Sequence, residues 1–207
     1  RTGVPVRAAL RALPPRDAAI LDFGLNPERK TLLAMGGSQG ARAINQALID
    51  LARDSGVPPG WQLLVVSGER EYDRVRRELP ADDAVVRPYL DDPSAGYAVA
   101  DLVLARAGAS TLAELAASGK PAILVPYPFA SDDHQTANAA RFEESGAGIV
   151  VTDQDVQRGR LRAAVAEATS PARIAALRAA AQHLRAGDAV ATILARVDWL
   201  AARKTSL

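Results

Sequence analysis

Short apolar runs separated by amphipathic stretches repeat along most of the chain. Runs of strand length lie at Thr31–Met35, Trp61–Ser67, Ala84–Tyr89, Asp101–Ala105, Pro121–Pro126 and Gly148–Val151. The stretches between them place apolar residues three and four positions apart, a spacing that a helix gathers on one face; one such series is Ala43, Ile44, Ala47, Leu48 and Leu51. The pattern therefore predicts alternating strands and helices.

The strand-length runs are apolar at consecutive positions rather than at every second one. Leu63–Val66 and Ala122–Val125 contain no polar residue, which is typical of strands in a parallel sheet with helices on both faces. With right-handed crossovers, this alternation predicts an α/β fold: a doubly wound, six-stranded parallel sheet of the Rossmann-like type, with strand order 3-2-1-4-5-6.

The two ends of the chain follow other patterns. Four prolines among the first thirty residues indicate an irregular lead-in. After the sixth strand, helices rich in Ala, Leu and Arg are predicted at Val156–Thr169, Pro171–Arg185 and Ala189–Lys204. We therefore expect a lead-in or hinge segment at 1–30 and a single Rossmann-like domain at 31–207 with extra C-terminal helices.

Composition narrows the class of protein. The 207 residues include 25 Lys and Arg against 24 Asp and Glu, a net charge of +1, which argues against nucleic-acid binding through a broad basic surface. The absence of Cys excludes disulfides, thiolate zinc sites and a Cys nucleophile, and two His are too few for most imidazole metal sites. We expect a cytoplasmic protein without a metal or cofactor.

Membrane and secretion signals are not found in the sequence. The most apolar stretch, Pro121–Ala130, is too short for a membrane span and contains three prolines. The chain begins at Arg1 without Met or an apolar leader, so we expect a part of a longer protein. The Arg-rich stretches Arg70–Arg77 and Arg158–Arg173 are expected to be solvated helical faces rather than membrane-binding surfaces.

Two turns made of small residues each follow a predicted strand. The first strand runs into Gly36–Ala41, and the fourth runs through Arg106 into Ala107–Thr111. Each turn leads into a helix, whose first N–H groups and positive dipole end attract anions. Since strands one and four are neighbours in the predicted sheet, both turns open on one crevice, which favours a diphosphate site. A tight turn with Ser38 as N-cap is the structural alternative for the first turn.

Other nucleotide-binding motifs fit the first turn poorly. Gly40 is followed by Ala41 and Arg42 where a P-loop needs Lys and then Ser or Thr, so a P-loop is excluded. The glycine spacing also differs from that of a dinucleotide fingerprint, although Glu69, just past the second strand, keeps a dehydrogenase open as a weak alternative.

Polar groups on two predicted helices have both a structural and a ligand-binding interpretation. Glu114 has capping-box spacing from a threonine, but a carboxylate one turn into a phosphate-binding helix also suits ribose hydroxyls. His134, Gln135 and Asn138 place neutral hydrogen-bonding groups on one helical face, which suits sugar hydroxyls. Asp132 and Gln135 also have capping-box spacing, and spacing alone favours capping for both helices.

Four motifs together resemble a known family. They are TGVPVR at 2–7, GGSQGAR at 36–42, AGASTLAE at 107–114, and the run from Pro126 through DHQTAN at 133–138. In this order they resemble the C-terminal, donor-binding half of the MurG family of peptidoglycan glycosyltransferases, glycosyltransferase family 28, over nearly the whole chain. Val4 departs from the family pattern, which usually has Asn before the proline.

The resemblance implies a two-domain enzyme of the GT-B fold. The family transfers N-acetylglucosamine from UDP-N-acetylglucosamine (UDP-GlcNAc) to a lipid-linked muramoyl-pentapeptide, with inversion at the anomeric carbon. The chain would then be the UDP-GlcNAc-binding half, inactive without the N-terminal acceptor domain of the same protein, and Arg7 would lie near the hinge. The full enzyme would bind the lipid-linked acceptor as a peripheral protein at the cytoplasmic face of the cell membrane, with no nucleic-acid partner.

The resemblance also implies which residues hold the phosphates and the ribose. The diphosphate would be held by the backbone at Gly37 and by Ser38, Ser110 and Thr111. Glu114 would accept hydrogen bonds from the ribose hydroxyls, which gives its carboxylate a partner beyond the capping role that spacing suggests.

The remaining implied contacts concern the base and the sugar. The backbone at Leu90 would read the uracil edge, with Arg106 nearby. His134, Gln135 and Asn138 would contact the N-acetylglucosamine ring.

A metal motif is not required for this chemistry. Backbone N–H groups at a helix N-terminus can stabilise the charge that develops on the leaving phosphate. Asp153-Gln154-Asp155 has the spelling of an Asp-x-Asp motif, but its place before a helix predicts an acidic N-cap. No catalytic residue is assigned, and the general base of an inverting transfer is expected in the N-terminal half.

Alternative functions remain open at this point. The chain could be a self-standing donor subunit of a two-chain N-acetylglucosaminyltransferase, or a non-catalytic nucleotide-sugar-binding module. A UDP-GlcNAc epimerase shares this general architecture but requires acidic and His catalytic groups that the sequence does not display.

Overall fold

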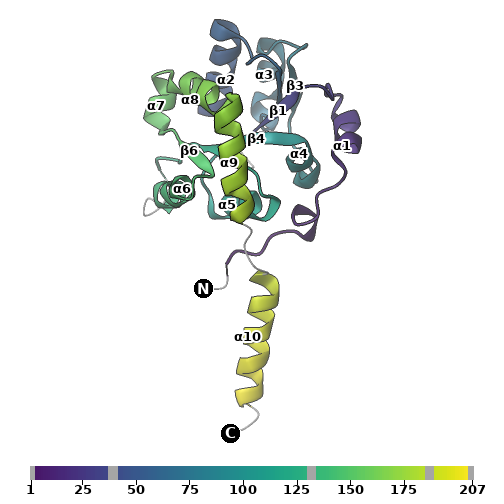
Figure 1. Cartoon of the computed structure of the whole chain (residues 1–207), viewed down its shortest axis with the longest axis vertical. Helices are drawn as coiled ribbons and strands as arrows, with labels where there is room; N and C mark the ends of the chain where they lie inside the picture. Colours follow the sequence, from purple (N-terminus) through teal and green to yellow (C-terminus); the bar gives the residue numbers. More distant parts are fainter. Residues whose placement is uncertain (1–2, 37–41, 130–133, 185–188, 205–207) are drawn as a thin grey trace.

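The computed structural model describes residues 3–36, 42–129, 134–184 and 189–204, and within these ranges it contains one sheet of six parallel strands (Figure 1). The strands are β1 (Lys30–Met35), β2 (Trp61–Val66), β3 (Ala84–Arg87), β4 (Ala100–Ala105), β5 (Ala122–Leu124) and β6 (Gly148–Val150). Their order is β3-β2-β1-β4-β5-β6. The predicted fold class and strand order are confirmed.

Helices cover both faces of the sheet and meet two apolar cores. One core takes side chains from α2 (Arg42–Ser55), α3 (Tyr72–Glu78), α7 (Asp153–Gln157) and α8 (Arg160–Thr169). The other takes side chains from α1 (Arg16–Phe23), α4 (Pro93–Val99), α5 (Ala109–Ser118) and α6 (His134–Glu144). Helix α9 (Pro171–His183) contributes to both cores. The described segments also include two short 3-10 helices, η1 (Ala8–Leu10) and η2 (Glu69–Glu71).

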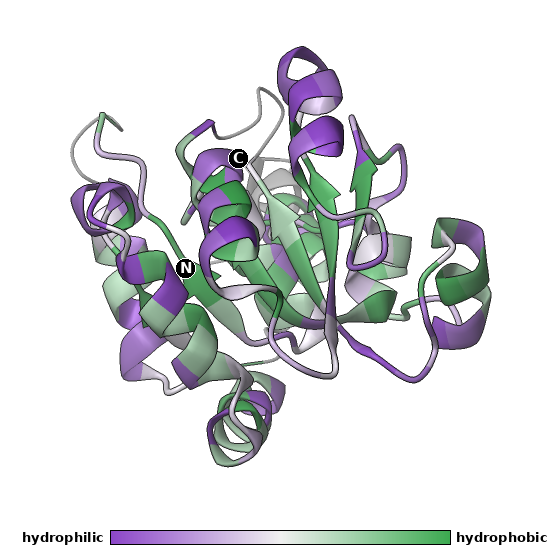
Figure 2. Ribbon diagram, turned by 90° about the horizontal axis from the view of Figure 1, so that it is seen from above, coloured by the Kyte–Doolittle hydropathy of each residue, from purple (hydrophilic) through white to green (hydrophobic). Residues whose placement is uncertain are grey.

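Strand residues alternate between the two cores, which explains the continuous apolar runs. Along β1, Leu32 and Ala34 belong to one core and Leu33 to the other. On β4, Leu102 and Val103 are divided in the same way, and both are fully buried. Because both faces of the sheet are covered, most strand positions carry apolar side chains, and the buried polar exceptions Thr31, Gln62 and Asp101 are hydrogen-bonded. Figure 2 shows hydrophobic strands between helices that carry both hydrophilic and hydrophobic residues.

Strands β1 and β4 pair along their length, with Met35 opposite Ala105 at their carboxyl ends. The chain leaves β1 toward β2 and leaves β4 toward β5, on opposite sides of this pair. The ends of two adjacent strands therefore form a topological switch point, the usual place for a ligand in an open α/β sheet.

The prediction that residues 1–30 are irregular is wrong in part. Helix α1 buries Ala19 and Ile20 and packs against α4, and it ends at Gly24, whose φ of 72° is the left-handed conformation that suits glycine. The short helix was hidden in the sequence because its pattern is barely amphipathic and prolines flank it on both sides.

The predicted helix Val156–Thr169 is divided into α7 and α8. Gly159 adopts a φ of 79° between them, a conformation that interrupts helical hydrogen bonding. The other C-terminal helices begin at the predicted residues, and Pro171 occupies the first turn of α9, where its missing N–H has no helical partner to lose.

Helix α10 (Ala189–Lys204) stands away from the sheet and its covering helices (Figure 1). Ala189, at its start, is buried, whereas Val190, Leu194, Val197 and Trp199 are exposed. Among the described residues, no helix combines the length and the apolar character needed to span a membrane.

Candidate functional site

A cavity of about 810 Å³ opens at the carboxyl ends of the central strands. Met35 of β1, Val66 of β2 and Ala105 of β4 form its floor, and each is the last residue of its strand. The loops after β3 and β5 and the start of α5 complete the wall. The cavity therefore occupies the switch point that the strand order creates.

Most of the predicted binding residues that the structure describes come together here. The residues lining the cavity include Arg7, Leu90, Arg106, Thr111, Glu114 and Gln135. Ser110 is exposed beside Thr111, whereas His134 and Asn138 on α6 are not among the lining residues. Gly37 and Ser38 lie outside the described residues.

The N-terminus of α5 faces this cavity without a side-chain cap. Gly108 is the N-cap, and the first helical hydrogen bond runs from the Leu112 N–H to the Gly108 carbonyl, at 3.0 Å. The preceding N–H groups, up to that of Thr111, have no acceptor within the helix. Such N–H groups, together with the positive end of the helix dipole, attract anions, so this end of α5 is suited to an anionic ligand.

The predicted capping box at Thr111 and Glu114 is wrong. Thr111 is the third residue of the helix rather than its N-cap, because α5 already begins at Ala109. The Glu114 carboxylate is instead half-buried at the cavity wall, where its Oε2 accepts a hydrogen bond from the Tyr97 hydroxyl at 3.0 Å. Glu114 is therefore placed to meet a ligand.

Tyr97 is a residue of this site that the sequence analysis missed. It is completely buried on α4. Burial, together with the neighbouring Glu114 charge, raises the pKa of Tyr97, so the phenol remains a donor at ordinary pH. Its only sequence signal is a tyrosine in an otherwise small and apolar stretch, which predicts core packing rather than a polar contact.

Arg106 lies between β4 and α5 and binds the segment that follows β5. Its guanidinium pairs with Asp153 at 2.6 Å and donates to the carbonyls of Val125 and Pro126, both at 3.3 Å. It also lies 5.4 Å from the centre of the Tyr127 ring. The contacts neutralise much of its charge and hold the loop that forms one wall of the cavity.

The prediction of an acidic N-cap at Asp153–Asp155 is wrong in its details. Thr152 is the N-cap of α7, and its Oγ1 accepts from the Asp155 N–H at 3.1 Å. Asp153 in the first turn is used for the ion pair with Arg106. Neither aspartate serves as the N-cap itself.

Gln135 is also fixed at the cavity wall. Its Oε1 accepts from the Tyr127 N–H at 3.0 Å, which joins α6 to the loop after β5. The alternative capping partner, Asp132, lies outside the described residues. Tyr127 and Phe129 form an edge-to-face pair on this exposed loop, with ring centres 5.7 Å apart.

The N-terminal segment reaches the cavity through Arg7. Its guanidinium donates to the Asp91 carbonyl at 3.2 Å, in the loop after β3. The next residue, Asp92, caps α4 by accepting from the Ser94 N–H and hydroxyl, and these bonds, with a smaller effect from Arg7, lower the pKa of Asp92. The loop that carries Leu90 is thus held by Arg7 of the N-terminal segment and by the hydrogen bonds between Asp92 and Ser94 of α4.

Metal-ligating groups do not cluster in this part of the protein. Within the described residues, no three His, Cys, Asp or Glu side chains lie close enough to hold a metal ion. The described lining of the cavity instead offers the backbone N–H groups at the start of α5, the Thr111 hydroxyl, the Gln135 amide, the Glu114 carboxylate and the guanidinium groups of Arg7 and Arg42.

Comparison with known proteins relates this geometry to one family. Residues 31–193 match the family model of the glycosyltransferase family 28 C-terminal domain. A curated relative from Desulforudis audaxviator, named UDP-N-acetylglucosamine--N-acetylmuramyl-(pentapeptide) pyrophosphoryl-undecaprenol N-acetylglucosamine transferase, is 38% identical over 99% of this chain and 57% of its own length. A relative of the same name from Frankia casuarinae is 38% identical over 99% of this chain and 56% of its own length.

The solved structures agree with the sequence relatives. The crystal structure of MurG from Acinetobacter baumannii matches with a TM-score of 0.69 and 27% identity, covering 85% of this chain and 50% of that one. The chain thus spans about half the length of the relatives it matches, and its match to the family model extends over most of its residues. The chain belongs to glycosyltransferase family 28 and corresponds to the C-terminal domain of the proteins in that family.

Proposed function

We propose that this domain binds UDP-GlcNAc as the donor of an inverting transferase that attaches N-acetylglucosamine to a lipid-linked muramoyl-pentapeptide in peptidoglycan synthesis. The observation that carries the proposal is the cavity in which the uncapped N-terminus of α5 and the Glu114 carboxylate lie together. An uncapped helix N-terminus suits a diphosphate, and a carboxylate suits the hydroxyls of a ribose. A nucleoside diphosphate carries both groups and so can bind both features at once.

The diphosphate is assigned to the N-terminus of α5. Ser110 and Thr111 offer hydroxyls next to backbone N–H groups that have no acceptor within the helix, and Gly37 and Ser38, which follow β1 in the sequence, belong to the same proposed contact set. Glu114 follows Ser110 by four residues, roughly 6 Å along the helix axis. That separation is compatible with a ribose whose hydroxyls reach Glu114 while its phosphates lie at the helix end.

The base and the sugar are assigned to the loops on either side. The backbone at Leu90 would meet the uracil, and Gln135 would meet the sugar from the opposite wall. His134 and Asn138 complete the proposed sugar contacts, although in the structure they lie outside the cavity lining. Arg106 would act through the loop that it holds, because its charge is already paired with Asp153.

The proposed chemistry assigns leaving-group stabilisation to this half of the enzyme. When the bond between the sugar and the β-phosphate breaks, negative charge grows on the phosphate, and fixed N–H groups at the start of α5 would stabilise it. We assign the general base and the acceptor site to an N-terminal half that corresponds to the remaining length of the relatives. The full enzyme would act as a peripheral protein at the cytoplasmic face of the membrane, where its lipid-linked acceptor lies.

Calorimetry and a transfer assay test the two parts of this proposal. The chain should bind UDP-GlcNAc and be competed by UDP, and it should not transfer the sugar to the lipid-linked acceptor by itself. Transfer should return when the N-terminal half is supplied. Absence of UDP-GlcNAc binding would contradict the proposal, and transfer by the chain alone would place the base within it.

A charge placed at the start of α5 gives a sharper test. Ser110→Asp adds a carboxylate at the second helical position, where the helix dipole favours it by about 0.5 kcal/mol but a bound diphosphate is repelled. Stability should stay equal or rise slightly, while the affinity for UDP-GlcNAc should fall at least tenfold.

The matched control is Ala172→Asp, at the second position of α9. This residue is also exposed but lies outside the cavity lining. The control should have the same small effect on stability and should leave the affinity unchanged. An equal loss of affinity in both variants, or none in Ser110→Asp, would reject the assignment of the diphosphate to α5.

A further inference from the structure

The Glu114 carboxylate can accept hydrogen bonds from a ligand at low entropic cost only if its side chain is already held in one orientation. A glutamate has three rotatable side-chain bonds, and ordering such a side chain on ligand binding costs roughly 1 to 2 kcal/mol. In the structure its carboxylate already has a partner, because the Tyr97 hydroxyl donates to Oε2 at 3.0 Å. The bond joins α4 to α5 across 17 positions of sequence.

Tyr97 provides a rigid anchor for this bond. Its ring is completely buried in the core that also contains Leu33, Val103 and Leu115. Leu115, the neighbour of Glu114 on α5, is itself fully buried, so the helix backbone is fixed by the same core. The hydroxyl thus has one accessible position, set by packing of a side chain with only two principal torsions.

The direction of the hydrogen bond follows from the protonation of the two groups. Burial and the Glu114 charge raise the pKa of Tyr97, so the phenol keeps its proton and donates it toward the carboxylate. An ionised carboxylate has about four acceptor positions on two oxygens, and one bond to Oε2 leaves the others for incoming donors. Ribose hydroxyls are such donors.

We propose that Tyr97 is a positioning residue for the donor, whose buried hydroxyl fixes the Glu114 carboxylate as the acceptor for the ribose hydroxyls and thereby makes the site selective for ribonucleoside over deoxyribonucleoside diphosphates. The inference rests on the proposed function, since it gives Glu114 its ribose. It goes beyond that function by naming a residue of α4 outside the cavity lining that sets the preference of the site for ribose.

A purely structural role for Tyr97 predicts a different outcome. If the bond served only to satisfy a buried phenol, its loss would lower stability and weaken all nucleotides equally. A positioning role predicts a selective loss, confined to ligands that carry the ribose hydroxyls. The ratio of the affinity for UDP to the affinity for a deoxy analogue therefore distinguishes a structural role of Tyr97 from a positioning role.

The experiment measures binding of UDP, 2′-deoxy-UDP and 3′-deoxy-UDP by calorimetry to the wild-type chain and to Tyr97→Phe. The wild type should bind UDP more tightly than either deoxy analogue. The affinity of Tyr97→Phe for UDP should be about tenfold lower than that of the wild type, the size expected for the loss of a hydrogen bond to a charged group. Its affinity for the deoxy analogues should fall less than twofold. In a Glu114→Ala background, which has no carboxylate for Tyr97 to position, the same substitution should have no further effect on the affinity for UDP.

Tyr72→Phe is the matched control. The Tyr72 hydroxyl on α3 accepts a hydrogen bond from Arg76, and the residue is not part of the cavity lining. The control should keep the wild-type ratio of affinities. If Tyr97→Phe also keeps that ratio while UDP binding persists, the role of Tyr97 is rejected and the proposed function stands; if the wild type binds no UDP, both are rejected.

Glu114→Asp provides a second route should Tyr97→Phe fail to fold. It keeps the charge but draws the carboxylate back by one methylene, away from the Tyr97 hydroxyl. The preference for UDP over its deoxy analogues should fall as in Tyr97→Phe. Full retention of the preference would overturn the proposal.

Discussion

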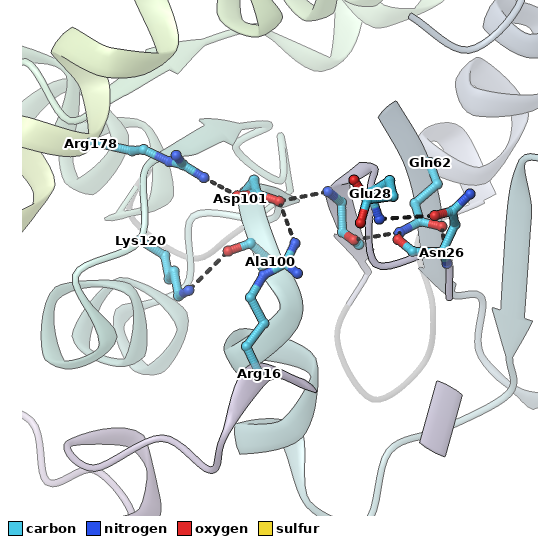
Figure 3. Close-up of polar contacts among 9 residues, drawn as sticks. Arg16, Asn26, Glu28, Gln62, Ala100, Asp101, Lys120 and Arg178 are labelled. Atoms are coloured by element: carbon cyan, nitrogen blue, oxygen red, sulfur yellow. Dashed lines mark hydrogen bonds and ion pairs between the residues drawn. The ribbon is translucent and has the colours of Figure 1, made fainter. Parts of the chain in front are cut away.

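Two carboxylates near the opposite ends of β4 have contrasting surroundings. Asp101, at the start of the strand, is bound from three sides: its Oδ2 accepts from the Thr31 N–H at 2.8 Å and from Arg16 at 3.1 Å, and its Oδ1 accepts from Arg178 (Figure 3). Beside this cluster, Lys120 donates to the Ala100 carbonyl at 2.9 Å. These bonds join β1, β4, α1 and α9 into one unit.

Glu114 lies on the helix that follows the other end of β4 and lines an open cavity; among the described residues, its carboxylate accepts one side-chain hydrogen bond, from Tyr97. Both carboxylates are ionisable groups next to the same strand. Asp101 binds three protein donors beside a cavity of about 320 Å³, whereas Glu114 binds one described donor and lines the cavity of about 810 Å³. The Asp101 charge therefore joins separate segments of the fold, whereas Glu114 lines the cavity in which we propose that the donor binds, at the edge where an open α/β sheet usually holds its ligand.

Asp101→Asn should have the largest effect on stability of the substitutions that test the contrast between Asp101 and Glu114. The substitution removes the charge that compensates Arg16 and Arg178 while keeping an acceptor for Thr31. The free energy of unfolding should fall by about 3 kcal/mol, at the low end for a broken buried pair because the side chains of Arg16 and Arg178 are 36% and 40% exposed. Urea unfolding measures the loss.

The comparison also requires that the folded Asp101→Asn protein binds UDP-GlcNAc with unchanged affinity. Asp50→Asn serves as the control, because its pair with Arg53 has side chains 42% and 65% exposed and should contribute less than about 1 kcal/mol. Equal losses of stability in the two variants would remove the distinction between the Asp101 cluster and an ordinary surface ion pair.

The next effect is a dependence of stability on pH that comes from Lys120. Burial, with Arg178 and Arg16 nearby and despite the opposing charge of Asp101, lowers the pKa of Lys120 from 10.5 to about 8. The unfolded chain then binds more protons than the folded one between these values, so Lys120 makes stability rise with pH in that window. Between pH 8 and 10 its contribution should amount to about 2 kcal/mol.

Lys120→Met isolates this contribution. The variant should lose the upward slope between pH 8 and 10, measured as the difference from wild type in urea unfolding at each pH. The measurement stops near pH 10 because the raised pKa of Tyr97 begins to lower stability above that pH. There the tyrosine of the unfolded chain loses its proton while that of the folded chain keeps it. A slope identical to that of the wild type would show that Lys120 is charged in the folded state throughout this range.

The smallest effect expected is that of Glu114→Gln, and it should fall on binding rather than on folding. The amide keeps an oxygen to accept from Tyr97, so stability should change by less than about 1 kcal/mol. Affinity for UDP-GlcNAc should drop about tenfold, because the ribose hydroxyls lose a charged acceptor. Glu167→Gln, an exposed substitution on α8, should change neither quantity. A large loss of stability in Glu114→Gln would make Glu114 resemble Asp101 and end the contrast.

Much of the fold follows from the order of residues along the chain. Continuous apolar runs such as Leu63–Val66 predict strands covered on both faces, and the alternation of strands and helices with right-handed crossovers predicts the sheet order and the switch point. The small-residue turn before α5 likewise predicts an exposed helix N-terminus. These features depend on local periodicity and backbone conformation, which neighbouring residues specify.

The tertiary structure alone decided which polar groups meet. Spacing paired Glu114 with Thr111 in a capping box, but α5 begins early enough for Glu114 to bind Tyr97 on another helix. In the same way, Asp153 was predicted to cap a helix and instead pairs with Arg106, 47 positions away. A side chain can bond to any group that packing brings within reach, and in a partly buried place a well-aligned donor from a distant segment, the Tyr97 hydroxyl or the Arg106 guanidinium, can be more favourable than a local cap. Sequence therefore determined the order of the strands and the edge at which we propose that a ligand binds, and packing between distant segments determined how the side chains at that edge are held.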